Sequence, residues 1–174
     1  MRARTRHALM AAAAALMAAG CSVEPRSDSA ATRGAQGAAP AEAPRRQIVQ
    51  PEGVARLPVF SSAVRSGNIL YLSGALGALP DVMPPQLVEG GVGPETRQTM
   101  ENIITVLAAE DLTLQDLVKC SVFLADIAEY AAMNEVYLEY FPSDPPARSA
   151  LAGSGLALGA RVEIECIAAY PEGR

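Results

Sequence analysis

Two segments of the chain, residues 117–124 and 161–169, show the alternation of apolar and polar side chains that predicts a β-strand with one buried face. The residues expected on the buried faces are Val118, Cys120, Val122 and Leu124 in the first strand, and Val162, Ile164, Cys166 and Ala168 in the second. The opposite faces carry Lys119, Ser121 and Phe123, and Glu163, Glu165 and Ile167. A sheet face that mixes charge with large apolar side chains is typical of a subunit interface that contains a polar pocket.

Two further segments have the periodicity of amphipathic helices. A proline and a glutamate directly after Gly93 favour the start of a helix there. The apolar residues that follow lie at helical spacing and are Met100, Ile103, Ile104 and Leu107. Asp126 and Glu129 have the spacing of an N-cap and its partner three residues later, which predicts a second helix that runs to about Tyr140.

Shorter apolar runs complete the predicted sheet. Residues 60–64 and 69–73 are expected to form a hairpin, residues 86–89 a short strand, and residues 148–151 an extended segment. The glycines and prolines of residues 74–85 predict a loop. This order of elements predicts an α+β fold, in which one mixed sheet carries both helices on one of its faces.

The N-terminal segment has the pattern of a targeting signal. Three arginines precede an apolar run at residues 8–19, which is too short to span a bilayer core. Small residues lead from this run to Cys21, and the whole resembles a bacterial lipoprotein signal. We therefore expect a signal peptide at residues 1–20 and a lipid anchor on Cys21, facing the periplasm from the outer membrane if the cell is Gram-negative. An ordinary secretory signal peptide is the alternative.

The folded domain is expected to begin after a linker. Residues 21–51 are rich in Ala, Pro, Gly, Ser and Arg and contain almost no large apolar side chain. Such a segment cannot bury enough surface to offset the entropy lost on ordering, so a disordered tether is predicted. Residues 52–174 then form the domain.

Composition narrows the possible chemistry. The formal net charge is −5, and an acidic chain repels phosphate backbones, which disfavours nucleic-acid partners. The only histidine, His7, lies in the predicted signal peptide, so the mature chain has none for a Ser-His-Asp triad, a Cys-His pair or a zinc site. Lys119 is the only lysine. We therefore expect chemistry based on carboxylates, arginine, hydroxyls, backbone groups and water.

Two cysteines fall within the predicted sheet. Cys120 and Cys166 are both expected on the face that packs against the helices, where we interpret them as small buried hydrophobic residues. An oxidising compartment would permit a disulfide between them. Their spacing in the sequence does not show whether they lie within reach of each other.

Five segments, in order, resemble motifs of the RidA/YjgF family of imine/enamine deaminases. They are residues 69–74 (ILYLSG), 118–126 (VKCSVFLAD), 134–141 (NEVYLEYF), 146–149 (PARS) and 162–168 (VEIECIA). The resemblance covers about residues 56–170. It implies a chorismate-mutase-like fold, assembled as a homotrimer with ligand clefts between subunits. It also implies hydrolysis of 2-imino acids, formed from 2-aminoacrylate and related enamines, to 2-oxo acids and ammonia. No metal and no organic cofactor is expected for this reaction.

The resemblance also assigns roles to individual residues. Arg148 is expected to bind the substrate carboxylate bidentately, because a guanidinium presents parallel donors. Glu163 is expected to orient or deprotonate the attacking water, and a structural charge paired with an interface arginine is its alternative role. The remaining substrate-binding candidates are Phe60, Ser73, Gly74 and Asn134. The chain departs from the family pattern at Ser62, Ala75 and Ala150, which affects the expected polarity of the pocket.

Two other functions remain open at this point. The cleft could capture a small carboxylate without converting it, which would make the protein a trimeric binding module. The trimer could also be a tether or scaffold with a vestigial cleft, although such a cleft has no need of a guanidinium at position 148.

Overall fold

The computed structural model describes residues 46–54 and 57–172. The predicted signal peptide, the lipidation site Cys21 and most of the predicted tether lie outside these residues. In the part of the chain that is described, no helix is both long and apolar enough to cross a membrane.

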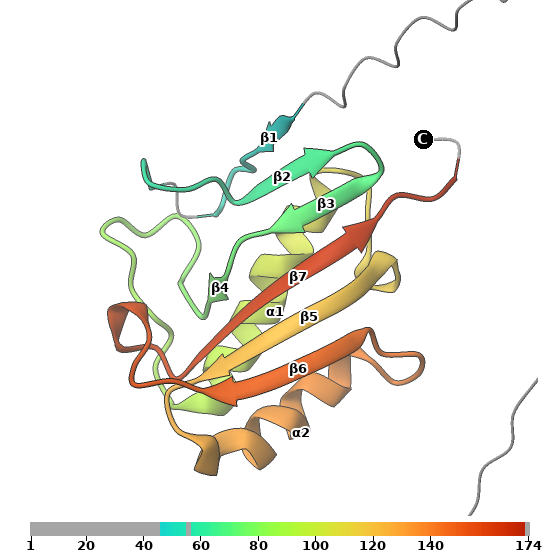
Figure 1. The fold of residues 1–174 in the computed structure, drawn as a ribbon. Coiled ribbons are helices and arrows are strands. Elements are labelled where there is room, and N and C mark those ends of the chain that lie inside the picture. Colours follow the sequence, from blue (N-terminus) through green and yellow to red (C-terminus); the bar gives the residue numbers. More distant parts are fainter. Residues whose placement is uncertain (1–45, 55–56, 173–174) are drawn as a thin grey trace, which may run out of the picture. The chain divides into compact units, whose positions relative to one another are not determined.

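The described residues form one seven-stranded mixed sheet with two α-helices (Figure 1). The strands are β1 (Gln47–Val49), β2 (Ala63–Ser66), β3 (Ile69–Leu72), β4 (Ala75–Leu76), β5 (Leu117–Leu124), β6 (Ala147–Ala152) and β7 (Val162–Ala169). Their order is β1-β2-β3-β7-β5-β6, and β4 pairs with β7 beyond the end of β3. Strands β5 and β6 are parallel and the other pairs are antiparallel.

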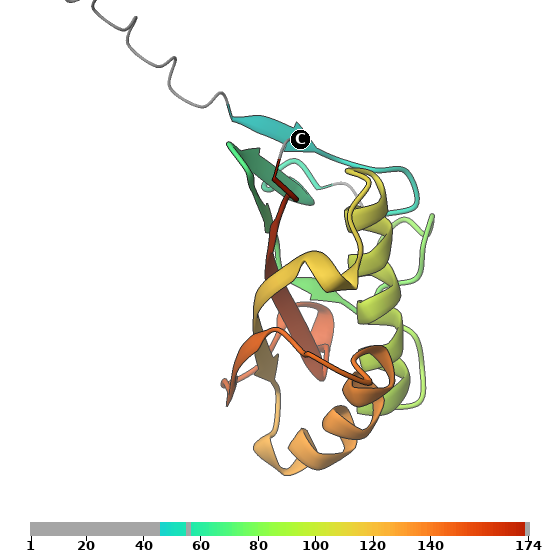
Figure 2. The ribbon, with the colours of Figure 1, turned by 90° about the vertical axis from the view of Figure 1, so that its right-hand side faces the viewer.

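Both helices lie on the same side of this sheet. Helix α1 spans Val92–Ala108 and α2 spans Tyr130–Tyr140, and Figure 2 shows the sheet edge-on with both of them on one face. Short 3-10 helices are found at Leu114–Asp116, Ile127–Glu129 and Ala157–Gly159. The predicted α+β architecture is therefore confirmed.

The core lies between the sheet and the helices. Val162, Ile164, Cys166 and Ala168 of β7 are buried, as the alternation predicts, and they pack with Met100, Ile103 and Leu107 of α1. The prediction for Val118 is wrong, because this side chain is 47% exposed. A bulge in β5 between Leu117 and Lys119 shifts the register, so that Leu117 is buried instead.

Several element boundaries differ from those predicted. The strand expected at residues 60–64 begins only at Ala63, and residues 86–89 contribute a single bridge, Ala78–Leu87, instead of a strand. Residues 47–49, within the segment assigned to the tether, form β1 and pair with β2, where Val49 is buried. The predicted loop at 74–85 contains the short strand β4, since Ala75 and Leu76 pair with β7.

The predicted N-cap is present but acts one element earlier than expected. The Asp126 carboxylate accepts a hydrogen bond of 2.9 Å from the backbone N–H of Ala128. This bond caps the 3-10 helix at 127–129, which leads directly into α2 at Tyr130.

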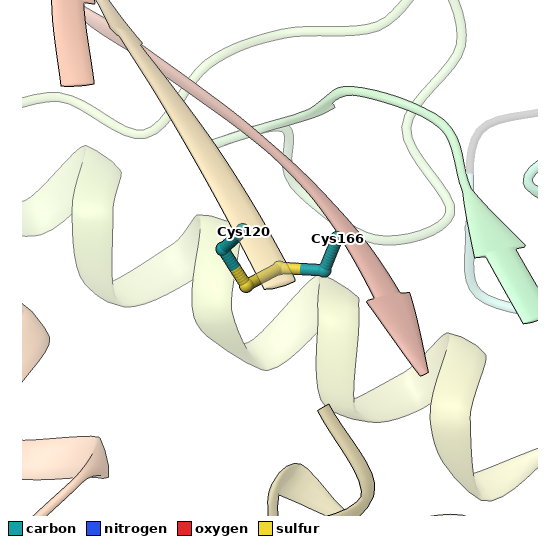
Figure 3. The surroundings of a disulfide bond; sticks show 2 residues. All are labelled: Cys120 and Cys166. Atoms are coloured by element: carbon teal, nitrogen blue, oxygen red, sulfur yellow. A yellow bond between two sulfur atoms is a disulfide. The ribbon is translucent and has the colours of Figure 1, made fainter. Parts of the chain in front are cut away.

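A disulfide joins Cys120 of β5 to Cys166 of β7 (Figure 3). Both side chains are buried, as expected, but the interpretation of them as simple hydrophobic residues is corrected. The antiparallel register places the two residues directly opposite each other, with their Cα atoms 4.1 Å apart. The cross-link spans 46 residues of sequence, for which loss of chain entropy in the unfolded state gives roughly 4 kcal/mol of stabilisation.

Candidate active site

The first group of candidate residues surrounds the start of β4. Gly74 lies so close to Glu163 of β7 that a Cβ atom on the glycine would be 1.8 Å from the Glu163 Oε1 atom. The lack of a side chain at position 74 therefore makes room for the Glu163 carboxylate. We call Phe60, Ser73, Gly74 and Glu163 the glutamate half-site.

Hydrogen bonds hold the loop of this half-site in place. The Ser73 hydroxyl donates to the Ser61 carbonyl at 2.7 Å, and the Ser73 N–H donates to the Ser62 carbonyl at 3.0 Å. On the other side, the Asn102 amide of α1 donates to the carbonyls of Leu76 and Ala78 at 3.0 and 2.8 Å. Satisfying these backbone acceptors fixes the loop against the helix.

A small cavity adjoins the same residues. Its volume is about 40 Å³, and Phe60, Ser73 and Gly74 line it together with side chains of the core. The structure thus brings three of the predicted substrate-binding residues together. Phe60 is 48% exposed, so its side chain remains partly open to solvent.

The environment of Glu163 favours its protonated form. Partial burial raises the pKa of this carboxyl above its usual value, and the neighbouring negative charge of Glu165 raises it further. A carboxylate can accept a proton from water and return it, which is what general acid–base catalysis requires, and the raised pKa makes Glu163 a stronger base.

The second group lies where β6 crosses α2. The Arg148 guanidinium of β6 donates a hydrogen bond of 3.0 Å from Nη2 to the Tyr130 hydroxyl. Its central carbon lies 4.7 Å from the centroid of the Tyr137 ring, within the range of a cation–π contact. Asn134 lies one helical turn after Tyr130 on α2, and hydrogen bonding with its side chain is the main cause that lowers the pKa of the Tyr130 hydroxyl. We call Tyr130, Asn134, Tyr137 and Arg148 the arginine half-site.

The two half-sites face opposite sides of the sheet within one chain. Arg148 is the register partner of the buried Cys120 and contacts α2, so it lies on the helix side. Glu163 alternates with the buried Val162 and Ile164 and pairs with Phe123, so it lies on the face without helices, the open face. The chain alone therefore does not bring the two predicted catalytic residues together.

The open face carries a second polar pocket. Its volume is about 210 Å³, and its lining includes Tyr71, Lys119, Ser121, Glu165 and Ile167. The Lys119 ammonium donates a hydrogen bond of 2.7 Å to the Ser149 hydroxyl on β6. This mixture of charged and large apolar side chains agrees with the predicted composition of the face.

Tyr130 and Tyr137 are the site residues that sequence reasoning missed as partners of Arg148. Their sequence signal was present, because they lie seven residues apart on one helix with Asn134 between them. The pattern indicated only that they share a helix face, which is equally typical of core packing. Within the described ranges, no three His, Cys, Asp or Glu side chains gather closely enough to hold a metal ion.

Comparison with known proteins identifies the family. The family model described as "Endoribonuclease L-PSP" matches residues 51–170. A goat protein named "2-iminobutanoate/2-iminopropanoate deaminase" is 42% identical over 124 residues, which cover 71% of this chain and 89% of that protein. The chain belongs to the RidA/YjgF family. The resemblance inferred from the five sequence motifs is thereby confirmed.

Two further relatives support this assignment. The Arabidopsis thaliana protein "Reactive Intermediate Deaminase A, chloroplastic" is 36% identical over 125 residues, which cover 71% of this chain and 66% of the relative. The crystal structure of RidA from the Antarctic bacterium Psychrobacter sp. PAMC 21119 superposes with a TM-score of 0.66 at 36% identity, covering 71% of this chain and 98% of that one. The fold described above is therefore that of RidA proteins.

The close approach of Gly74 to Glu163 gives a direct test of the glutamate half-site. Replacement of Gly74 by Ala forces the Glu163 carboxylate to move, because the new Cβ would overlap it. We expect kcat for imine hydrolysis to fall roughly 10- to 100-fold, since misplacement of a catalytic group by about 1 Å has effects of this size. The melting temperature should change little, because the displaced atoms belong to the end of a flexible side chain.

Gly93→Ala is the matched control. A Cβ at this position of α1 would meet only Val136 Cγ2, at an ordinary contact distance of 3.7 Å. This variant should retain wild-type kinetics. Equal kcat values for Gly74→Ala and Gly93→Ala would contradict the placement of Glu163 in the active site.

Proposed function

We propose that this chain hydrolyses reactive 2-imino acids to 2-oxo acids and ammonia, in clefts between the subunits of a homotrimer. The observation that carries the proposal is the arginine half-site. There the Arg148 guanidinium lies over the Tyr137 ring and donates a hydrogen bond to the Tyr130 hydroxyl. The names of the relatives, which include an imine deaminase and a reactive-intermediate deaminase, support the same activity.

Arg148 would bind the substrate through its carboxylate. A guanidinium forms two parallel hydrogen bonds to a carboxylate, which fixes both the position and the plane of the acid group. The aromatic contact with Tyr137 restricts the guanidinium before substrate arrives, so less entropy is lost on binding.

Glu163 would act on water. In the proposed reaction, the carboxylate accepts a proton from a water molecule as the oxygen attacks the imine carbon, and a carbinolamine forms. Glu163 passes that proton to the nitrogen, which completes the neutral carbinolamine. It then moves the carbinolamine hydroxyl proton to the same nitrogen, so that the C–N bond breaks and ammonia leaves as the C=O bond of the 2-oxo acid forms. The raised pKa of Glu163 suits both transfers.

A trimer would bring the two half-sites together. Arg148 lies on β6, which is an edge strand of the sheet, and Glu163 lies on the open face, where Tyr71 is 49% exposed. An exposed face of this composition favours association with further copies of the chain. In the proposed assembly, Arg148 of one subunit approaches Glu163 of the partner subunit.

The description of the family model names an endoribonuclease, and the properties of this chain favour the deaminase. Its formal net charge of −5 opposes the approach of a phosphate backbone. No histidine follows His7, so the described domain has no imidazole for acid–base catalysis on RNA.

Replacement of Arg148 by Ala tests the proposed activity. If an amino-acid oxidase generates 2-iminopropanoate, wild-type protein should accelerate its loss, and Arg148→Ala should lower kcat/KM at least about 100-fold because two charge-assisted hydrogen bonds are lost. The kcat/KM of Arg148→Lys should lie between those of the wild type and Arg148→Ala, since lysine keeps the positive charge but lacks the parallel N–H donors of the guanidinium.

Arg97→Ala is the control for loss of an exposed arginine. Arg97 pairs with Glu139 between the two helices and has no contact with either half-site. It should leave the rate unchanged. Wild-type protein that only matches the buffer rate would rule out the deaminase and leave the alternative of a module that binds small carboxylates.

We also propose that the protein is exported and anchored in the cell envelope through a lipid on Cys21. The arginine-rich start, the short apolar run and the small residues before Cys21 support this localisation. The disulfide between Cys120 and Cys166 supports it independently, because disulfides persist in oxidising compartments and are rare in the cytosol.

Cell fractionation tests the anchor and the disulfide together. Wild-type protein should be recovered with membranes, and Cys21→Ala should not be, because the acceptor for the lipid is lost. Peptides that contain Cys120 and Cys166 should be linked in digests prepared without reductant. Recovery of both proteins in the cytosolic fraction with free thiols would refute the proposed localisation.

A further inference from the structure

The Arg148 guanidinium contacts two tyrosines, and each contact restricts a different part of its orientation. The Tyr137 ring lies under the guanidinium, 4.7 Å from its central carbon, and Tyr137 is only 3% exposed. A ring beneath a planar cation fixes the height and tilt of the plane, but it leaves the cation free to turn within that plane. A directional contact is needed to set which edge of the guanidinium faces an incoming carboxylate.

Tyr130 supplies the directional contact. Its hydroxyl oxygen accepts the 3.0 Å hydrogen bond from Arg148 Nη2, and among the described residues it is the only hydrogen-bond partner of the Arg148 guanidinium. The Tyr130 ring is also within 5.6 Å of the guanidinium carbon. One N–H group is thus occupied, and the remaining N–H groups keep the parallel geometry that a carboxylate needs.

Asn134 lies close to Tyr130 along α2. It follows Tyr130 by four residues on α2, so both side chains lie on the same helix face. The hydrogen bond from the Asn134 side chain, together with the charge and hydrogen bond of Arg148, lowers the pKa of the Tyr130 hydroxyl. Both partners therefore favour a hydroxyl oxygen that acts as an acceptor, which is the role required to hold the guanidinium.

We propose that Tyr130 is a positioning residue, whose hydroxyl sets the in-plane orientation of the Arg148 guanidinium for the substrate carboxylate. This inference rests on the proposed role of Arg148 in carboxylate binding. Tyr130 is 39% exposed, so it lies at the surface from which a ligand would arrive.

Tyr130→Phe removes the hydroxyl and keeps the ring. We expect KM for 2-iminopropanoate to rise roughly five- to tenfold, the size of one typical intramolecular hydrogen bond, with kcat changed less than twofold. The dissociation constant of 2-oxobutanoate, measured by calorimetry, should rise by a similar factor. In an Arg148→Lys background, Tyr130→Phe should have no further effect, because a lysine has no plane to orient.

Tyr170→Phe is the matched control. Its hydroxyl also bonds a charged side chain, donating to Glu110 at 2.5 Å, but it lies outside both half-sites. It should leave KM and the 2-oxobutanoate affinity unchanged. Wild-type values for Tyr130→Phe, or a loss confined to kcat, would overturn the inference.

The two measurements separate this inference from the proposed function. If wild-type protein fails to hydrolyse the imine but binds 2-oxobutanoate, and Tyr130→Phe weakens that binding, the deaminase fails and the positioning role stands. If wild-type protein hydrolyses the imine and Tyr130→Phe is indistinguishable from it, the positioning role fails alone. If wild-type protein neither hydrolyses the imine nor binds the 2-oxo acid, both are overturned.

Discussion

The register between β7, β5 and β6 is the constraint on which the rest of the structure depends. In this register Cys166, Cys120 and Arg148 lie side by side on the helix face, and Glu163 lies beside Phe123 on the open face. A slip of one residue would exchange these faces and expose the apolar core. Burial of Val162, Ile164 and the neighbouring positions, together with the disulfide, opposes such a slip. The core therefore determines which side of the sheet each proposed catalytic residue occupies.

The strongly patterned elements could be predicted from the sequence because burial on one face leaves a period in the residue types. Strand β7 and most of β5 follow their alternation, α1 begins near the predicted start, and α2 ends at the predicted Tyr140. The bulge that exposes Val118 could not be seen in the sequence pattern, since valine is common on both the buried and the exposed faces of strands. Strand β1 is only three residues long and lies in polar sequence, and its stability comes from pairing with β2.

The site was less predictable because its contacts are tertiary. The family motifs pointed to Arg148, Glu163 and Gly74, and the structure adds the close approach of Gly74 to Glu163. The contacts of Arg148 with Tyr130 and Tyr137 depend on how β6 packs on α2, and the disulfide depends on the register of β5 with β7. Neither arrangement has a sequence period, so spacing along the chain could not show it.

The central claim is that an active site forms only where the arginine half-site of one subunit meets the glutamate half-site of another. Mixed trimers test it most directly, because Arg148→Ala and Glu163→Gln each damage a different half-site. After unfolding and refolding together in equal amounts, random assembly leaves both halves intact at about a quarter of the clefts. The account predicts that the mixture regains about a quarter of wild-type imine hydrolysis, although each variant alone is inactive. A mixture that assembles as trimers and stays at the rate of the separate variants would contradict it.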